Sequence, residues 1–236
     1  MAKSPNKPSA ITMVLSDAKA LSQQLERLRN IQQDFRFPSE FSAQDAYLLL
    51  YTALRIEVKR TGHKLLTTDS TTQAVSALAH YVTAKGRWVQ TGFMFCGVPG
   101  NGKTSMLYAL QSAIEWIRYK GLFCQAYSQY DMDNMQIVRS KEIVKIATSD
   151  GLLTCYKRKP LLGIDDLGAE PGELLNYGNV QTPMIDLIEA RYNARLFTVI
   201  TTNLTGAQIR QKYGARIADR LNEMMHVMIF KNDTFR

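Results

Sequence analysis

Eight residues near the middle of the chain have the types and spacing of a phosphate-binding loop. Residues 97–104 read Gly-Val-Pro-Gly-Asn-Gly-Lys-Thr and fit the pattern G-x-x-x-x-G-K-[ST] at every fixed position. The glycines let backbone N–H groups turn inward towards an anion, Lys103 can reach the β- and γ-phosphates, and the Thr104 hydroxyl can ligate Mg²⁺. The candidate nucleotide-binding residues are Gly97, Val98, Pro99, Gly100, Asn101, Gly102, Lys103, Thr104 and Ser105.

A pair of carboxylates at the end of a later apolar run could complete this site. Asp165 and Asp166 close the segment Leu-Leu-Gly-Ile-Asp-Asp, which reads as a buried strand. Phosphoryl transfer from a nucleotide uses a carboxylate beside the metal ion and the γ-phosphate. Asp165 is therefore the candidate for contact with Mg²⁺, either directly or through a bound water, beside Thr104, and Asp166 is the candidate for positioning or activating the attacking water.

These residues need a scaffold that brings loops from different strands to one edge. After residue 88, short apolar runs alternate with helix-forming stretches, which is typical of a parallel sheet covered by helices on both faces. The expected strands lie at residues 92–96, 122–126, 161–165, 197–201 and 227–230. The expected helices lie at residues 103–119, 129–147, 179–195 and 205–224. The sequence thus predicts an α/β fold with a parallel five-stranded sheet between helices.

The first third of the chain reads as helical. Residues 1–10 are polar, contain two prolines and are expected to be disordered. The predicted helices lie at residues 16–34, 42–60 and 72–84. The first carries an apolar stripe of Leu21, Leu25, Leu28 and Ile31, which either packs on the second helix or binds a partner.

Composition narrows the class of protein. The 29 Lys and Arg against 21 Asp and Glu give a net charge of +8, which fits a nucleic-acid partner as well as it fits a solvated basic surface. No apolar run has the roughly 18 residues of a membrane-spanning helix, and the first residues do not resemble a signal peptide. The three cysteines lie far apart, which excludes a disulfide framework and the familiar zinc spacings. We expect a cytoplasmic protein without membrane contact.

Five segments occur in an order that resembles a known family. They are GVPGNGKT, LLGIDDLGAE, VITTNL, YGARIADRL and FKNDTFR. Together, over residues 93–236, they are similar to the AAA+ ATPases of the DnaC/DnaI replicative-helicase loaders and the related IstB transposition helpers. The resemblance implies that residues 71–236 form a P-loop AAA+ domain that binds ATP and Mg²⁺ and has no separate carboxy-terminal lid domain.

The resemblance also implies roles for polar residues outside the loop. Asn203 matches a sensor residue that contacts the γ-phosphate or the attacking water. Arg216 and Arg220 match the segment that supplies an arginine finger, with Arg220 favoured, and Arg236 matches a second sensor of the nucleotide. A finger acts on the nucleotide of another subunit, so the resemblance implies self-assembly with ATP or DNA, or assembly on a ring-shaped partner. Asp166 stands where many AAA+ proteins have Glu, so we expect slow hydrolysis.

The partners are implied by the same resemblance. Residues 11–70 would hold a hexameric replicative helicase, and Arg139, Lys141 and Lys145 would contact single-stranded DNA from the helix after the second strand. The implied function is ATP-dependent delivery of the helicase during replication initiation. Two alternatives stay open: an IstB-like helper that assembles on duplex DNA and recruits a transposase, and a nucleotide-gated adaptor with negligible turnover.

Overall fold

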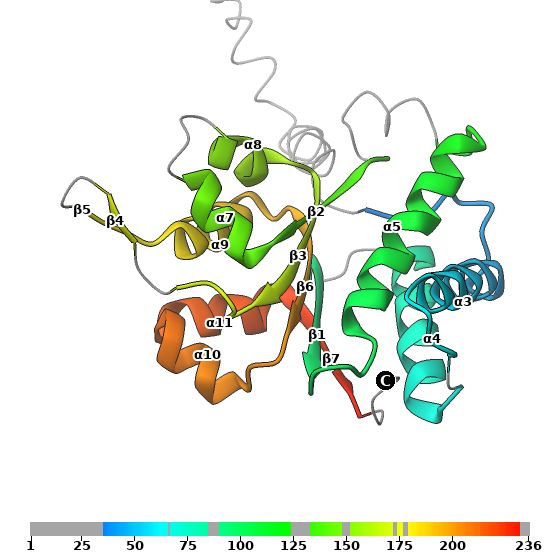
Figure 1. Ribbon diagram of the computed structural model, residues 1–236. Coiled ribbons are helices and arrows are strands. Elements are labelled where there is room, and N and C mark those ends of the chain that lie inside the picture. Colours follow the sequence, from blue (N-terminus) through cyan, green and yellow to red (C-terminus); the bar gives the residue numbers. More distant parts are fainter. Residues whose placement is uncertain are drawn as a thin grey trace, which may run out of the picture.

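The computed structural model describes residues 35–65, 67–84, 90–123, 133–147, 152–171, 174–176 and 179–231 of the 236-residue chain. The predicted helix at 16–34, its leucine stripe and Arg236 lie outside these residues. Within them, two layers of helices enclose a central sheet (Figure 1).

The central sheet has five parallel strands, as the alternating pattern predicts. The strands are β1 (Gly92–Gly97), β2 (Met135–Arg139), β3 (Leu161–Leu167), β6 (Phe197–Thr202) and β7 (Met225–Phe230). Their order across the sheet is β2-β3-β6-β1-β7. Two further short strands, β4 (Leu174–Asn176) and β5 (Asn179–Gln181), form an antiparallel pair apart from the sheet. The three inner strands are apolar runs because helices cover both of their faces.

The second strand lies later in the chain than the sequence predicts. Residues 122 and 123 are not in a strand, and residues 124–126 lie outside the described part of the chain. Instead β2 begins at Met135, within the stretch 129–147 that was expected to be one helix, and α7 (Ser140–Ala147) follows it directly. The strand is short, lies at the sheet edge and mixes apolar with exposed polar residues. Such a pattern is hard to distinguish from a helix by periodicity.

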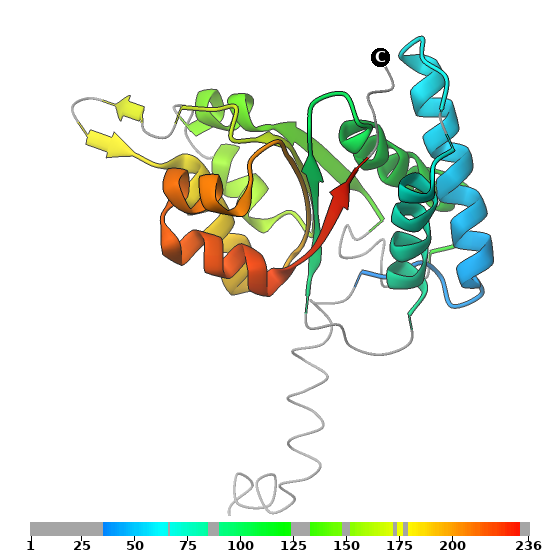
Figure 2. The same cartoon turned by 90° about the horizontal axis from the view of Figure 1, so that it is seen from below.

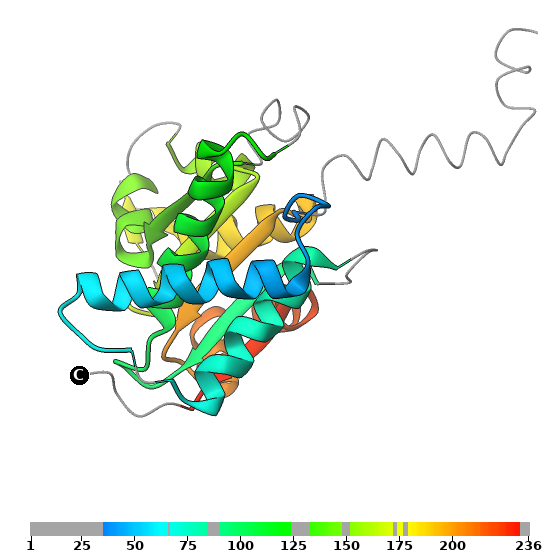
Figure 3. The ribbon, with the colours of Figure 1, turned by 90° about the vertical axis from the view of Figure 1, so that its right-hand side faces the viewer.

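One helical layer joins the amino-terminal helices to the helix after β1. It contains α3 (Ala43–Arg60), α4 (Asp69–Thr83) and α5 (Lys103–Tyr119). Helix α3 is capped by Ser42, which forms a capping box with Asp45. The helix contacts both α4 and α5, and Figure 3 shows the three helices together on this face of the sheet. Alternate strand residues such as Phe93 and Phe95 point into this layer. The predicted helices at 42–60 and 72–84 are therefore confirmed and share a core with the sheet.

The opposite layer consists of the later helices. It contains α7, α8 (Leu152–Arg158), α9 (Pro183–Ala194), α10 (Gly206–Tyr213) and α11 (Ala215–Met224), which lie across the sheet from α3 and α4 (Figure 2). Helix α9 starts at Pro183 rather than 179, because residues 179–181 form β5. The single helix expected at 205–224 is two helices, broken at Gly214, whose backbone (φ +85°, ψ 162°) is not helical.

A buried arginine fastens this second layer to the sheet. The Arg191 side chain of α9 donates hydrogen bonds to the carbonyl oxygens of Tyr156, Lys159 and Phe197 and to the Thr198 hydroxyl, at 2.7–2.8 Å. Burial lowers the pKa of Arg191 to about 9, which still leaves the guanidinium charged at neutral pH. In the parts of the chain that are described, none of the helices has both the length and the apolar character needed to cross a membrane.

Candidate active site

The strand order brings the predicted site residues to one edge of the sheet. Strand β6 lies between β1, which leads into the phosphate loop, and β3, which ends in Asp165 and Asp166. Asn203 follows β6 directly. Because the strands are parallel, the phosphate loop, the two carboxylates and Asn203 all lie at their carboxyl ends, which is where open α/β sheets bind ligands.

The phosphate loop between β1 and α5 has the backbone that its glycines permit. Gly97, Gly100 and Gly102 have φ values of +150°, +86° and +93°. A Cβ atom on Gly97 would lie 2.3 Å from Asn101 Nδ2 and 2.6 Å from the Phe230 carbonyl oxygen. Asn101 is itself fully buried and donates from Nδ2 to that same carbonyl at 2.8 Å. The loop is thus anchored to the end of β7 and leads into the amino terminus of α5, where helix N–H groups favour an anion.

Lys103 is folded into the loop that precedes it. Its Nζ atom donates to the carbonyl oxygens of Gly97 and Val98 and to Asn101 Oδ1, at 2.7–2.9 Å. Burial lowers the pKa of the Lys103 ammonium, while the nearby Asp166 carboxylate raises it. Phosphate oxygens can take the place of these three acceptors. The Lys103 ammonium acts as a compact point charge, so it can pair with a phosphate oxygen as it pairs with these protein oxygens.

Two hydroxyl groups converge on the Asp165 carboxylate. Thr104 Oγ1 donates to Asp165 Oδ1 at 2.9 Å, and Thr201 Oγ1 of β6 donates to the same oxygen at 2.7 Å. Asp165 is 4% exposed. An alcohol and a carboxylate at the mouth of a phosphate loop are the hard oxygen donors that Mg²⁺ prefers, so the residues present fit this ion. Thr201 was not predicted, because a threonine in an apolar strand gives no signal of its own.

Asp166 has an unusual backbone that its neighbours hold in place. Its φ of +60° is rare for a residue other than glycine. Its N–H donates to Thr201 Oγ1 at 2.9 Å, and its carbonyl accepts from the Ser140 hydroxyl at 2.6 Å. Asn203 Nδ2 lies 3.4 Å from Asp166 Oδ1. The structure therefore brings together the two residues that were assigned to the attacking water, and Ser140 is a second support that the sequence did not reveal.

The pocket at this edge includes residues from the amino-terminal helices. A cavity of about 330 Å³ is lined by residues 99–105, Asp166 and Asn203. Its remaining wall is Val58, Thr61 and His63, at and just beyond the end of α3. These three were not predicted, because nothing in their spacing marks them and they lie in the stretch 11–70 that was assigned to partner binding. An apolar and imidazole wall beside a phosphate loop suits the base or sugar of a nucleotide.

The two candidate finger arginines lie away from this pocket. Arg216 and Arg220 are on α11, a helix that lies in the layer opposite α5 (Figure 2). Neither residue lines the pocket. Both form ion pairs with Glu189 Oε1 of α9, and the Arg220 guanidinium also lies 5.1 Å from the centre of the Tyr192 ring. Arg216 is largely exposed, with 73% of its side chain accessible, whereas Arg220 is 15% accessible. Neither arginine contributes to the lining of this pocket.

The candidate DNA-binding residues lie beside the site, on two different elements. Arg139 is the last residue of β2, not part of a helix as expected, and pairs in register with Asp165 of β3. Lys141 and Lys145 are on α7. All three side chains are exposed. The register of β2 with β3 places Arg139 at the same edge of the sheet as Asp165, and α7 begins directly after it.

Comparison with known proteins relates the chain to others by fold. No protein-family model and no curated protein sequence matches it. Among solved structures, the DnaC helicase loader matches with a TM-score of 0.53 and 22% identity, over 71% of this chain and 93% of that one. DnaI matches with a TM-score of 0.55 and 20% identity, over 89% of this chain and 100% of that one. A proposed primosome component from Streptococcus pyogenes serotype M3 matches with a TM-score of 0.54 and 21% identity, over 78% and 98%.

At these levels of identity the shared property is the fold. The chain has the α/β fold of the DnaC and DnaI structures, with a parallel five-stranded sheet between helices. This confirms the fold that the sequence resemblance predicts.

Proposed function

We propose that this protein is an ATP-dependent loader of a hexameric DNA helicase in replication initiation. The observation that carries the proposal is the meeting of Lys103, Thr104, Asp165, Asp166 and Asn203 at one sheet edge, in a fold shared with the DnaC helicase loader. The protein would act in the cytoplasm, where replicating DNA and its helicase are found.

The proposed reaction is hydrolysis of ATP, with each residue in a defined role. The phosphate loop binds the triphosphate, and Lys103 exchanges its carbonyl partners for phosphate oxygens. Thr104 and Asp165 would hold Mg²⁺, which neutralises charge on the phosphates when bound. Asp166 and Asn203 orient the attacking water. The Asp166 side chain is one methylene shorter than glutamate, so we expect slow turnover.

The finger arginines imply that the active form is an assembly. Because Arg216 and Arg220 lie in the layer opposite the phosphate-loop helix and do not line the pocket, we propose that they act on the nucleotide of another subunit. A guanidinium placed there stabilises charge that develops on the transferred phosphoryl group. Arg236 would sense the bound nucleotide. We therefore propose that ATP or DNA promotes assembly of this protein, with itself or on the helicase ring.

The proposed DNA contact is a single strand on Arg139, Lys141 and Lys145. Replacing all three with alanine should weaken binding of a single-stranded oligonucleotide. The plot of log affinity against log salt should also become shallower by about 2, because each neutralised phosphate of a single strand contributes about 0.7 to its slope. A Lys59→Ala, Arg60→Ala variant, which removes two exposed cations at the end of α3, is the matched control. Unchanged affinity and slope in the triple variant would place the DNA elsewhere.

The test of function is affinity capture of the tagged protein from its host, once with ATP and once with ADP. Residues 11–70 are the proposed partner-binding region. A hexameric replicative helicase held in one nucleotide state and released in the other would support the loader. Co-purification of a transposase, or ATP-dependent filaments on duplex DNA, would indicate the transposition helper. Capture of the helicase with ATP bound but no turnover would indicate a nucleotide-gated adaptor.

A further inference from the structure

A second polar cluster lies beside the loop that follows Asp166. It consists of Glu170 in that loop and of Lys212 and Tyr213 at the end of α10, and we call it the latch cluster. Glu170 is 3% exposed, and its carboxylate accepts a hydrogen bond from the Tyr213 hydroxyl. Lys212 Nζ lies 3.7 Å from Glu170 Oε1. A buried carboxylate is costly unless it is paired and hydrogen-bonded, so these contacts are needed for Glu170 to occupy this position.

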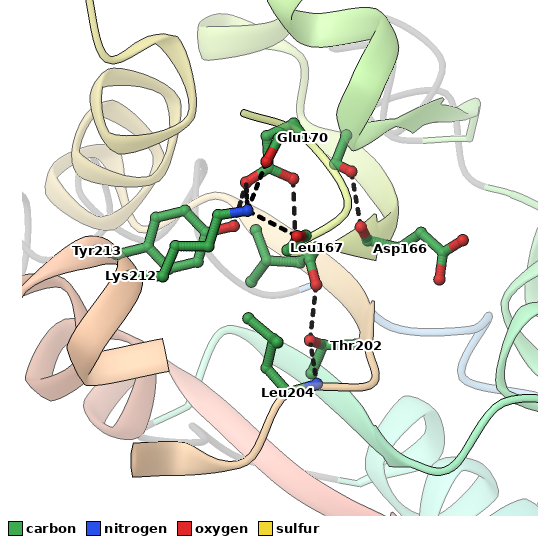
Figure 4. Close-up of polar contacts among 9 residues, drawn as sticks. Asp166, Leu167, Glu170, Thr202, Leu204, Lys212 and Tyr213 are labelled. Carbon is green, nitrogen blue, oxygen red and sulfur yellow. Dashed lines mark hydrogen bonds and ion pairs between the residues drawn. The ribbon is translucent and has the colours of Figure 1, made fainter. Parts of the chain in front are cut away.

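The latch cluster also forms hydrogen bonds with the backbone of the loop. Lys212 Nζ donates to the carbonyl oxygens of Gly168 at 2.6 Å and of Glu170 at 2.5 Å. Glu170 Oε2 accepts from the N–H of Gly168 at 3.0 Å. Figure 4 shows Lys212 and Tyr213 reaching from α10 towards Glu170, with Asp166 at the opposite side of the view. Side chains of α10 thus set the path of the backbone directly after Asp166.

The loop itself is a tight turn that depends on these contacts. The N–H of Ala169 donates to the carbonyl of Asp166 at 3.0 Å. Gly168 has a φ of +105°, and a Cβ there would lie 2.5 Å from the Leu204 side chain. On its other side, Thr202 Oγ1 donates to the Leu167 carbonyl at 2.7 Å. The strained φ of Asp166 persists only if such surroundings hold it.

The same cluster adjoins the helix with the finger arginines. Tyr213 ends α10, Gly214 breaks the helix, and α11 begins at Ala215, immediately before Arg216. A shift of the α10–α11 hairpin would therefore move Lys212 and Tyr213 together with the arginines. The loop that carries Asp166 is joined through three side chains to the element proposed to contact a neighbouring subunit.

We infer that Glu170, Lys212 and Tyr213 are positioning residues for ATP hydrolysis, which hold Asp166 in place and join it to the α10–α11 hairpin. The inference rests on the proposed function. The cluster does not line the nucleotide pocket, so its loss should alter turnover without altering nucleotide binding. A purely structural cluster would instead lower stability and leave the turnover of the folded protein unchanged.

The test compares two variants of the full chain with the wild type. Tyr213→Phe keeps the ring and removes the hydroxyl, and Glu170→Gln removes the charge at constant size. We expect each to lower kcat by about tenfold, since small misplacement of a catalytic group has effects of this order or larger. The Kd and KM for ATP should stay within about twofold, a split that reports on the transition state alone. The kcat of the double variant should be only slightly lower than that of either single variant, because the two residues act as one unit.

A matched control is available on the same hairpin. Asp219→Asn breaks the exposed ion pair between Asp219 of α11 and Arg210 of α10, and should leave kcat unchanged. Melting temperatures of all variants show which are folded. If folded Tyr213→Phe and Glu170→Gln both keep wild-type kcat, or if kcat and Kd worsen together, the positioning role is wrong. If the wild type itself neither binds nor hydrolyses ATP, the proposed function fails and the inference fails with it.

Discussion

The Thr104 hydroxyl donates a 2.9 Å hydrogen bond to the Asp165 carboxylate, although the two residues belong to different strand–loop units. Thr104 is the second residue of α5, the helix after β1, whereas Asp165 lies in β3, which is separated from β1 by β6. The contact joins the phosphate loop to the carboxylate pair, at the position proposed for a metal ion. It also gives the first prediction.

Asp165→Asn should remove the Mg²⁺ dependence of nucleotide binding. Asparagine keeps the shape and still accepts from Thr104 and Thr201, so the fold should be preserved. It lacks the negative charge that a hard cation requires. The measurement is titration of a fluorescent ATP analogue with and without Mg²⁺. Asp186→Asn, at an exposed position of α9, is the control. Retention of the full Mg²⁺ effect in Asp165→Asn would contradict the metal assignment.

Lys103→Ala should strongly weaken nucleotide binding. The ammonium is the one side-chain charge in the loop that can pair with the phosphates, and removing a charged hydrogen bond costs about 1.5–3 kcal/mol, or roughly 10- to 100-fold in affinity. Equilibrium binding of ATP measures this directly. Lys120→Ala, at the other end of the same helix, should bind as the wild type does. An unchanged affinity of Lys103→Ala for ATP would contradict the phosphate-loop assignment.

Arg220→Ala and Arg216→Ala should separate binding from hydrolysis. An isolated subunit should bind ATP normally, because neither side chain lines the pocket. Hydrolysis by the assembled protein should fall by at least about tenfold for the true finger, as removal of such arginines elsewhere costs considerably more. Turnover is measured against protein concentration, with Arg210→Ala on α10 as control. If the assembly hydrolyses ATP normally without Arg220, then Arg220 is not the finger.

Arg191→Met should destabilise the protein without acting on the site. The change leaves the carbonyl groups of Tyr156, Lys159 and Phe197 and the Thr198 hydroxyl without this donor, at about 1–3 kcal/mol for each group that stays buried and unsatisfied. We expect a loss of about 3 kcal/mol or more in urea unfolding. Arg158→Met, at an exposed position of α8, should change stability little. A variant as stable as the wild type would show that the guanidinium network contributes nothing net.

Cys96 should react with alkylating agents only at alkaline pH. Burial raises the pKa of its thiol, and the Lys103 ammonium opposes this shift only in part. Because the thiolate is the nucleophile, a raised pKa keeps the group protonated and unreactive near neutral pH, and reactivity should rise as pH increases. Peptide mass spectrometry after iodoacetamide treatment at pH 7 and pH 9 measures it, with the exposed Cys155 as internal reference. Equal labelling of both at pH 7 would contradict the prediction.

Much of the site can be recognised from local sequence. The phosphate loop, Asp165 and Asp166 lie where a strand ends. The loop is recognisable from its glycines and lysine, and the two aspartates are recognisable as charged residues that directly follow an apolar run. The strands near residues 92, 161, 197 and 227 were also predicted, because each is an apolar run that is visible in the local sequence. Strand β2 was placed wrongly because its register at the sheet edge comes from pairing with β3 rather than from a strong apolar pattern of its own.

Local patterns in the chain are enough to specify the chemistry: a phosphate-binding loop, a carboxylate pair, a polar residue after an apolar strand, and a parallel sheet to carry them. The distant side chains that support this chemistry become known only from the packed structure. Thr201 and Ser140 hold Asp166, His63 lines the pocket, and Glu170 meets Tyr213 across 43 residues of chain. Each of these is an ordinary polar residue whose role depends on a neighbour brought near by the strand order. Local sequence patterns do not indicate such long-range contacts, because these contacts form only when the sheet and its two helical layers pack together.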